Sequence, residues 1–431
     1  MRSTQQVSSA PILLQKKITL RLVIICMMAA SVGLSMVIIS ISKLLLLICG
    51  LATLLFVRRA PDAGKPLTGL FTPIAVLIAI CAFALSLLWT VAPQADALGS
   101  VAKYGKLLVI VLMMVLLRDR REAMYALTSF AAAQLFLVAS SWMLMAHWPV
   151  PWATSNMALT EYAVFSSYLD EGIISAVFAA ICWHLRSLVP GRFGRPLAIF
   201  IALIALVDVF FVLSGRSGHV VGIALLSIAI MWELPKKYRG VVVLLPFLLA
   251  LALFFSSSKV RERLTQVRTD VNSYSTQVDA TSSSGIRLSL WRRAIQVMSQ
   301  HPVAGAGVGS WSTEYNRLER AQNPAHIDIN GNGNPHQEYL LWGAQLGIPG
   351  VLLIGFLMSS VLRDTQGMGR PYARATQSTV LALAVACLFN SSIYDAQIGD
   401  FFCVLIGLLL ALGLRSADIQ NAAVPQQKYA T

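Results

Sequence analysis

Long apolar runs recur along most of the chain, and the charged residues gather between them. About twelve of these runs are candidate membrane-spanning helices, because continuous apolar stretches of this length suit a bilayer core. Barrel strands would instead alternate apolar and polar residues. The pattern therefore predicts an all-α polytopic membrane protein, with spans near 22–39, 44–57, 70–88, 102–117, 124–145, 173–185, 197–213, 220–232, 241–255, 351–361, 380–389 and 401–414.

One long polar stretch, 256–345, interrupts this pattern before the tenth predicted span. Within it, residues 285–300 have apolar side chains at helical spacing, which predicts an amphipathic helix ended by His301-Pro302. The loop is thus expected to be largely helical and to fold above the bilayer. The predicted organisation is a membrane domain of nine spans at 1–255, the loop at 256–345, three spans at 346–415 and a polar tail at 416–431.

Charge is scarce and unevenly placed. Only 13% of residues are charged, against about 25% in soluble domains. The net charge of +14 would suit nucleic acid, but 21 of the 34 Lys and Arg residues lie in the termini and alternate loops that share one side of the predicted membrane. This bias predicts cytoplasmic termini and an outward-facing 256–345 loop, with no nucleic-acid partner. In a bacterium the membrane would be the inner one and the loop would be periplasmic.

The sequence lacks the motifs of nucleotide, dinucleotide and metal binding. No Walker A motif appears, and the glycines of 305–309 fit a tight loop better than a dinucleotide site, because no βαβ unit surrounds them. The six cysteines lie inside apolar runs and have no metal-ligand spacing. The outer histidines lack neighbouring acids. We therefore expect no bound metal and no cofactor.

His336 is the first candidate for chemistry, in the segment Asn-Gly-Asn-Gly-Asn-Pro-His-Gln-Glu-Tyr-Leu-Leu. Asn334 suits an N-cap and Pro335 a first helical residue, which predicts His336 in the first helical turn. The positive helix end would favour the neutral imidazole, which accepts a proton. The alternative interpretation is an ordinary surface histidine at a helix cap.

Two arginines are misplaced for a membrane protein. Arg216 lies in a very short outer turn, where its guanidinium could bind phosphate or simply extend to the interface. Arg287 falls on the apolar stripe of the predicted 285–300 helix, so it needs an acid or a bound anion as a partner. Arg292 and Arg293 fit the solvated face of the same helix.

A basic cluster just above the ninth predicted span comprises Lys259, Arg261, Arg263 and Arg268. These side chains would meet lipid headgroups or a substrate. Both interpretations stay open from the residues alone.

These features together resemble the O-antigen ligase and polymerase superfamily. The resemblance covers about 211–356. It lies in the late outer loop, the Ser-Gly-Arg-Ser turn at 214–217, the Arg-x-x-x-Trp helix followed by His-Pro and Gly-Ala-Gly, and the Pro-His-Gln-Glu-Tyr-Leu segment at 335–340. Ser-Gly-Arg stands where many relatives have Ser-Arg, and Gln337 where they often have Asn.

The resemblance implies an inverting, metal-independent glycosyltransferase that uses an undecaprenyl-diphosphate-linked O-antigen and transfers it to lipid A-core. It implies that His336 is catalytic and that Arg216 and Arg287 hold the diphosphate, with Arg261, Arg263 and Tyr339 as further substrate contacts. Rival interpretations are an O-antigen polymerase, a protein (pilin) O-oligosaccharyltransferase, and a non-catalytic lipid or glycan transporter. The single large loop late in the chain favours a ligase.

Overall fold

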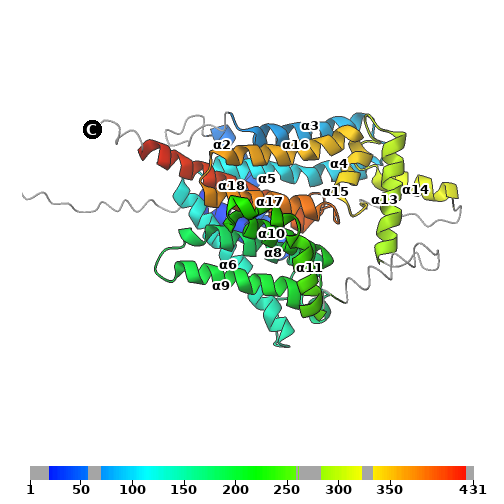
Figure 1. Ribbon diagram of the computed structural model, residues 1–431. Coiled ribbons are helices and arrows are strands. Elements are labelled where there is room, and N and C mark those ends of the chain that lie inside the picture. Colours follow the sequence, from blue (N-terminus) through cyan, green and yellow to red (C-terminus); the bar gives the residue numbers. More distant parts are fainter. Residues whose placement is uncertain (1–18, 57–68, 259–260, 262–282, 323–332, 424–431) are drawn as a thin grey trace, which may run out of the picture.

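The computed structural model describes residues 19–56, 69–258, 261, 283–322 and 333–423. This described part folds into helices and contains no strand, which confirms the predicted all-α class (Figure 1). The helices are α1 Leu20–Ser31, α2 Met36–Phe56, α3 Phe71–Leu85, α4 Gln94–Tyr104, α5 Leu108–Leu116, α6 Arg120–Met145, α7 Ala158–Glu161, α8 Tyr168–Leu185, α9 Gly194–Val207, α10 Arg216–Glu233, α11 Leu245–Ser256, α13 Ser283–Gln300, α14 Trp311–Gln322, α15 Glu338–Leu346, α16 Ile348–Asp364, α17 Arg370–Ala386 and α18 Ala396–Ala423.

Each predicted span overlaps a helix or a continuous helical segment, but the first, 22–39, is wrong in its bounds because the chain leaves the helix at 32–35, between α1 and α2. Eight helical segments in the described part are long and apolar enough to cross a membrane, so the chain is a multi-pass membrane protein. Among the others, α1 and α11 are shorter apolar helices. The count of twelve spans therefore stays a prediction.

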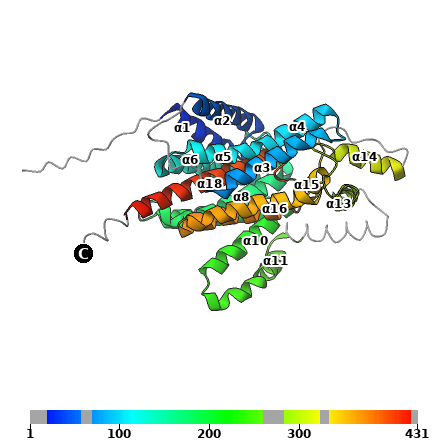
Figure 2. The same cartoon turned by 90° about the horizontal axis from the view of Figure 1, so that it is seen from above.

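The spans form a bundle around α18, whose apolar part is almost wholly buried against α5, α17 and α6. Figures 1 and 2 show most of the long helices running side by side, with α13 lying across one end of the bundle. Because α18 faces protein on all sides, it can be apolar all round without facing lipid. The end covered by α13 is the end that carries the long polar loop.

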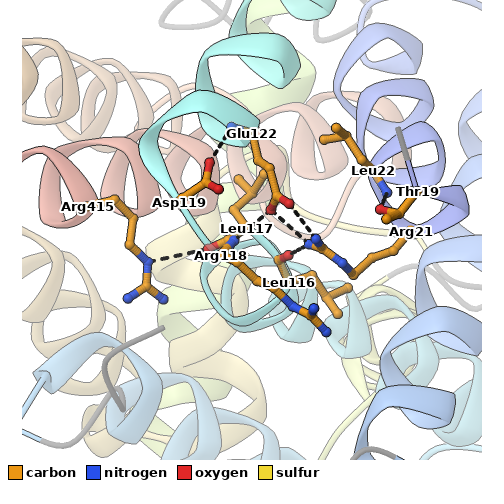
Figure 3. A network of polar contacts seen from close by, with 9 residues as sticks. All are labelled: Thr19, Arg21, Leu22, Leu116, Leu117, Arg118, Asp119, Glu122 and Arg415. Carbon is orange, nitrogen blue, oxygen red and sulfur yellow. Dashed lines mark hydrogen bonds and ion pairs between the residues drawn. The ribbon is translucent and has the colours of Figure 1, made fainter. Parts of the chain in front are cut away.

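A polar network fixes the opposite end of the bundle, at the turn between α5 and α6 (Figure 3). Arg21 of α1 forms an ion pair with Glu122 at 2.6 Å and also donates to the carbonyl of Leu116. Asp119 caps α6 by accepting from the Glu122 amide at 2.9 Å, and Arg415 of α18 donates to the Leu117 carbonyl at 3.4 Å. Four helices, α1, α5, α6 and α18, are thereby tied together where the predicted cytoplasmic basic residues gather.

The amphipathic helix predicted at 285–300 is α13, which ends before His301-Pro302 as expected. The glycine segment that follows is a tight loop, also as predicted. It bonds to α15 through the Gly307 amide and the Gln345 carbonyl at 2.9 Å, and to the 86–93 connection through the Thr90 hydroxyl and the Val308 carbonyl at 2.7 Å. This loop therefore joins α13, α15 and the α3–α4 connection into one platform at the end of the bundle covered by α13.

Candidate functional site

Arg216 is the first residue of α10 and is half-buried. The glycines around it allow α10 to approach α8 closely. A Cβ on Gly215 would lie 2.6 Å from the carbonyl oxygen of Tyr168, and one on Gly218 would lie 2.8 Å from the Cα of Gly172. The Ser-Gly-Arg-Ser-Gly sequence thus has a packing role, which places Arg216 beside the N-terminus of α8.

Arg287 projects from α13 into the same region and is half-buried, as its place on the apolar stripe predicts. Burial lowers the pKa of its guanidinium, and the positive charge of Arg216 lowers it further, whereas Tyr168 acts in the opposite direction. No described residue forms a hydrogen bond or ion pair with Arg287. Two cations held together in this way favour a bound anion.

His336 comes just before helix α15, so the prediction that it lies in the first helical turn is wrong. The helix begins at Glu338, with Gln337 as the N-cap accepting from the Leu340 amide at 2.6 Å. The Asn334 side chain instead accepts from the His336 backbone amide at 2.9 Å, which closes a local turn. His336 has a φ of +53°, a left-handed conformation that is uncommon outside glycine.

The imidazole of His336 is available for chemistry. His336 is an exposed residue, and no described residue forms a hydrogen bond with its ring. Partial burial lowers the pKa of His336 below its ordinary 6.5, and the positive charge of Arg287 lowers it further. Both effects favour the neutral ring, which can accept a proton. The lowered pKa agrees with the neutral imidazole predicted from the sequence, but its causes are burial and Arg287 and not the positive end of a helix.

Arg287 links the other two sequence-predicted residues, Arg216 and His336. Arg287 interacts electrostatically with both Arg216 and His336, although the three lie on separate segments. The structure gathers a neutral base and two cations at the loop end of the bundle. This arrangement can bind a diphosphate and deprotonate a neighbouring hydroxyl.

Asp395 is a nearby residue that the sequence reasoning missed. Its carboxylate accepts from the Asn334 amide nitrogen at 2.9 Å, so Asn334 links Asp395 to the His336 turn. Burial raises the pKa of Asp395 to about 6, while Lys106, Lys103 and the Asn334 hydrogen bond act against this rise. The polar break between the last two predicted spans, around 390–395, was the available signal.

The further predicted substrate contacts are Tyr339, Arg261 and Arg263. The Tyr339 hydroxyl donates to the Ala384 carbonyl at 3.0 Å, which fastens α15 to α17. Arg261 is described and exposed. Arg263 lies outside the described residues, as do Lys259 and Arg268 of the basic cluster.

The expectation that Arg293 lies on the solvated face of α13 is wrong, whereas Arg292 is exposed as expected. Arg293 is 7% exposed and forms an ion pair with Glu319 of α14 at 2.6 Å. Its other nitrogens donate to Gln296 and Gln322. Helix α14 covers this face of α13, which the helical period of α13 alone does not reveal.

No group of three or more His, Cys, Asp or Glu side chains in the described residues could hold a metal ion. Residues 198–355 match the family model described as O-antigen ligase. The match confirms the resemblance to the O-antigen ligase and polymerase superfamily over this segment, which contains Arg216, Arg287 and His336. Comparison with curated proteins finds no match.

Proposed function

We propose that the protein is an O-antigen ligase: it transfers a glycan from undecaprenyl diphosphate to a sugar hydroxyl of lipid A-core at the periplasmic face of the inner membrane. The observation that carries this proposal is the electrostatic coupling of Arg287 to both His336 and Arg216, because a base near two cations suits transfer from a diphosphate. The family match over 198–355 supports a ligase or polymerase type of activity.

In the proposed reaction, the acceptor hydroxyl oxygen attacks the anomeric carbon of the donor sugar. His336 takes the hydroxyl proton as the new glycosidic bond forms, and the bond between the anomeric carbon and the diphosphate oxygen breaks. Attack from the face opposite the leaving group inverts the anomeric centre. General base catalysis of this kind is worth about 10²- to 10⁴-fold in rate.

Arg216 and Arg287 have the complementary role in this proposal. As the bond breaks, negative charge builds on the departing diphosphate, and fixed cations stabilise that charge. The half-buried position of Arg287 strengthens its interaction with an anion, since less solvent screens it. Guanidinium groups also match phosphate oxygens in geometry.

The acceptor distinguishes the proposed ligase from the related activities. Transfer assays with purified protein can test which acceptor is used. The protein would be supplied with lipid-linked glycan and offered lipid A-core, a second lipid-linked glycan, or pilin. Transfer to lipid A-core alone is expected. Elongation of the lipid-linked glycan would identify a polymerase, and modification of pilin would identify an O-oligosaccharyltransferase. A folded protein that transfers no glycan to any acceptor would indicate a transporter.

A further inference from the structure

A large apolar pocket lies between α8, α9 and α10, toward the end of the bundle away from His336. Its volume is about 590 Å³, within the usual range of ligand pockets. Helix α8 forms its floor, and α9 and α10, which both pack on α8, form its walls. The helices can be followed in Figure 1.

The pocket arises because α9 and α10 converge at one end only. Near the loop end, a Cβ on Gly222 of α10 would lie 2.9 Å from the ring of Phe210, in the π-helical turn Asp208–Val212 that ends α9. Farther along, the floor carries the small side chains of Ala176, Ala179 and Ala180, and Trp183 follows them toward the mouth. The wedge between the helices is therefore left open and lined by hydrocarbon.

The mouth of this pocket is cationic. A second hollow of about 240 Å³ shares Arg186, Arg195 and Glu233 with it and adds Arg370 and Arg374. Four arginines and one glutamate leave a formal excess of three positive charges. These residues lie at the ends of α8, α9, α10 and α17 where the predicted cytoplasmic basic residues gather.

The arginines at the mouth differ in their partners. Arg186 forms an ion pair with Glu233 at 2.9 Å, and Arg374 lies 3.8 Å from the same carboxylate. Arg195 and Arg370 are exposed and form no hydrogen bond or ion pair with any described residue. Two guanidinium groups thus remain available above an apolar pocket.

We propose that this pocket binds a membrane phospholipid with an anionic headgroup, such as phosphatidylglycerol. An acyl chain would occupy the wedge between α9 and α10, and the headgroup phosphate would be held by Arg195 and Arg370. Basic pockets between membrane helices bind anionic lipid headgroups by this combination of apolar and charged contacts. The site is separate from the proposed transfer site, since α8 extends between them for about 27 Å.

The test is native mass spectrometry of the purified full-length protein titrated with phosphatidylglycerol or with phosphatidylcholine of the same chains. Wild-type protein is expected to bind phosphatidylglycerol more tightly. In the double variant Arg195→Gln/Arg370→Gln that affinity should fall by roughly 30-fold, from the usual contribution of two basic residues at an anionic surface. Phosphatidylcholine binding should change little.

A matched control is the double variant Arg192→Gln/Arg363→Gln, which removes two exposed arginines near the same end that do not line the pocket. It should bind phosphatidylglycerol like wild type. Equal loss in both double variants, or equal wild-type affinity for the two lipids, would overturn the proposal. Displacement of the lipid by millimolar inorganic phosphate would also overturn it, because the acyl chain would then contribute nothing.

Discussion

The glycine loop at 305–309, which joins the platform at the end of the bundle covered by α13, offers the sharpest structural prediction. Gly307 has a φ of +88°, and a Cβ there would lie 2.3 Å from the Cα and 2.5 Å from the Cβ of Thr90. A left-handed conformation costs a side-chain-bearing residue about 1–2 kcal/mol. Overpacking typically adds about 1–3 kcal/mol, and here the obstructing atoms include backbone, which cannot rotate away. Gly307→Ala should therefore destabilise the protein by about 2–5 kcal/mol.

Alanine substitutions at two other glycines separate the conformational cost from the overpacking cost. Gly191 has a φ of +87° with nothing within 4 Å of the added Cβ, so Gly191→Ala measures the conformational cost alone, about 1–2 kcal/mol. Gly355 lies inside α16 with equally open surroundings, so Gly355→Ala should be neutral or stabilising by up to about 1 kcal/mol.

The assay is thermal unfolding of the purified variants in one detergent, which ranks them by melting temperature. The expected order is Gly355→Ala highest, then Gly191→Ala, then Gly307→Ala. Glycan transfer should also fall in Gly307→Ala, because the loop supports α15 directly after His336. If Gly307→Ala melted no lower than Gly191→Ala, the close contact with Thr90 would be refuted.

Two further predictions concern the arginines of α13. Arg287→Gln removes a charge that lowers the pKa of His336, so the pKa of His336 should rise and the acidic limb of the pH profile of kcat/KM should move to higher pH. The control variant Arg292→Gln should leave the midpoint of that limb in place. An unmoved limb in Arg287→Gln would contradict the coupling. Arg293→Ala leaves the partly buried Glu319 unpaired and should lower the free energy of unfolding by about 3 kcal/mol in a denaturation assay. The control Arg292→Ala, at an exposed position, should lower it by less than about 0.5 kcal/mol. Equal losses in the two variants would refute the burial of Arg293.

The sequence predicted the helices well because their signals are local. Apolar runs and the stripe of α13 depend only on neighbouring residues, and His301-Pro302 ends that helix as expected. The half-burial of Arg287 followed from the same stripe. By contrast, the burial of Arg293 depends on α14, whose Glu319 lies 26 residues later in the chain, so the period of α13 could not reveal it.

The candidate site was predicted in its parts but not in its assembly. Residue types and turn chemistry singled out His336, Arg216 and Arg287, yet the cap prediction failed because Asn334 bonds to the His336 amide and to Asp395 instead of opening the helix. Asp395 lies 61 residues from Asn334 in sequence. Only tertiary packing brings such residues together, and no local pattern encodes that contact.

The central claim is that His336 is the base for glycan transfer. The most direct measurement is the transfer rate of purified His336→Ala protein from lipid-linked glycan to lipid A-core, with melting temperature checked against wild type. His301→Ala serves as the control, since His301 is another exposed histidine of the same loop. We predict a loss of about 10²- to 10⁴-fold in kcat for His336→Ala and near wild-type activity for His301→Ala. A folded His336→Ala protein that transferred glycan at the wild-type rate would contradict the account.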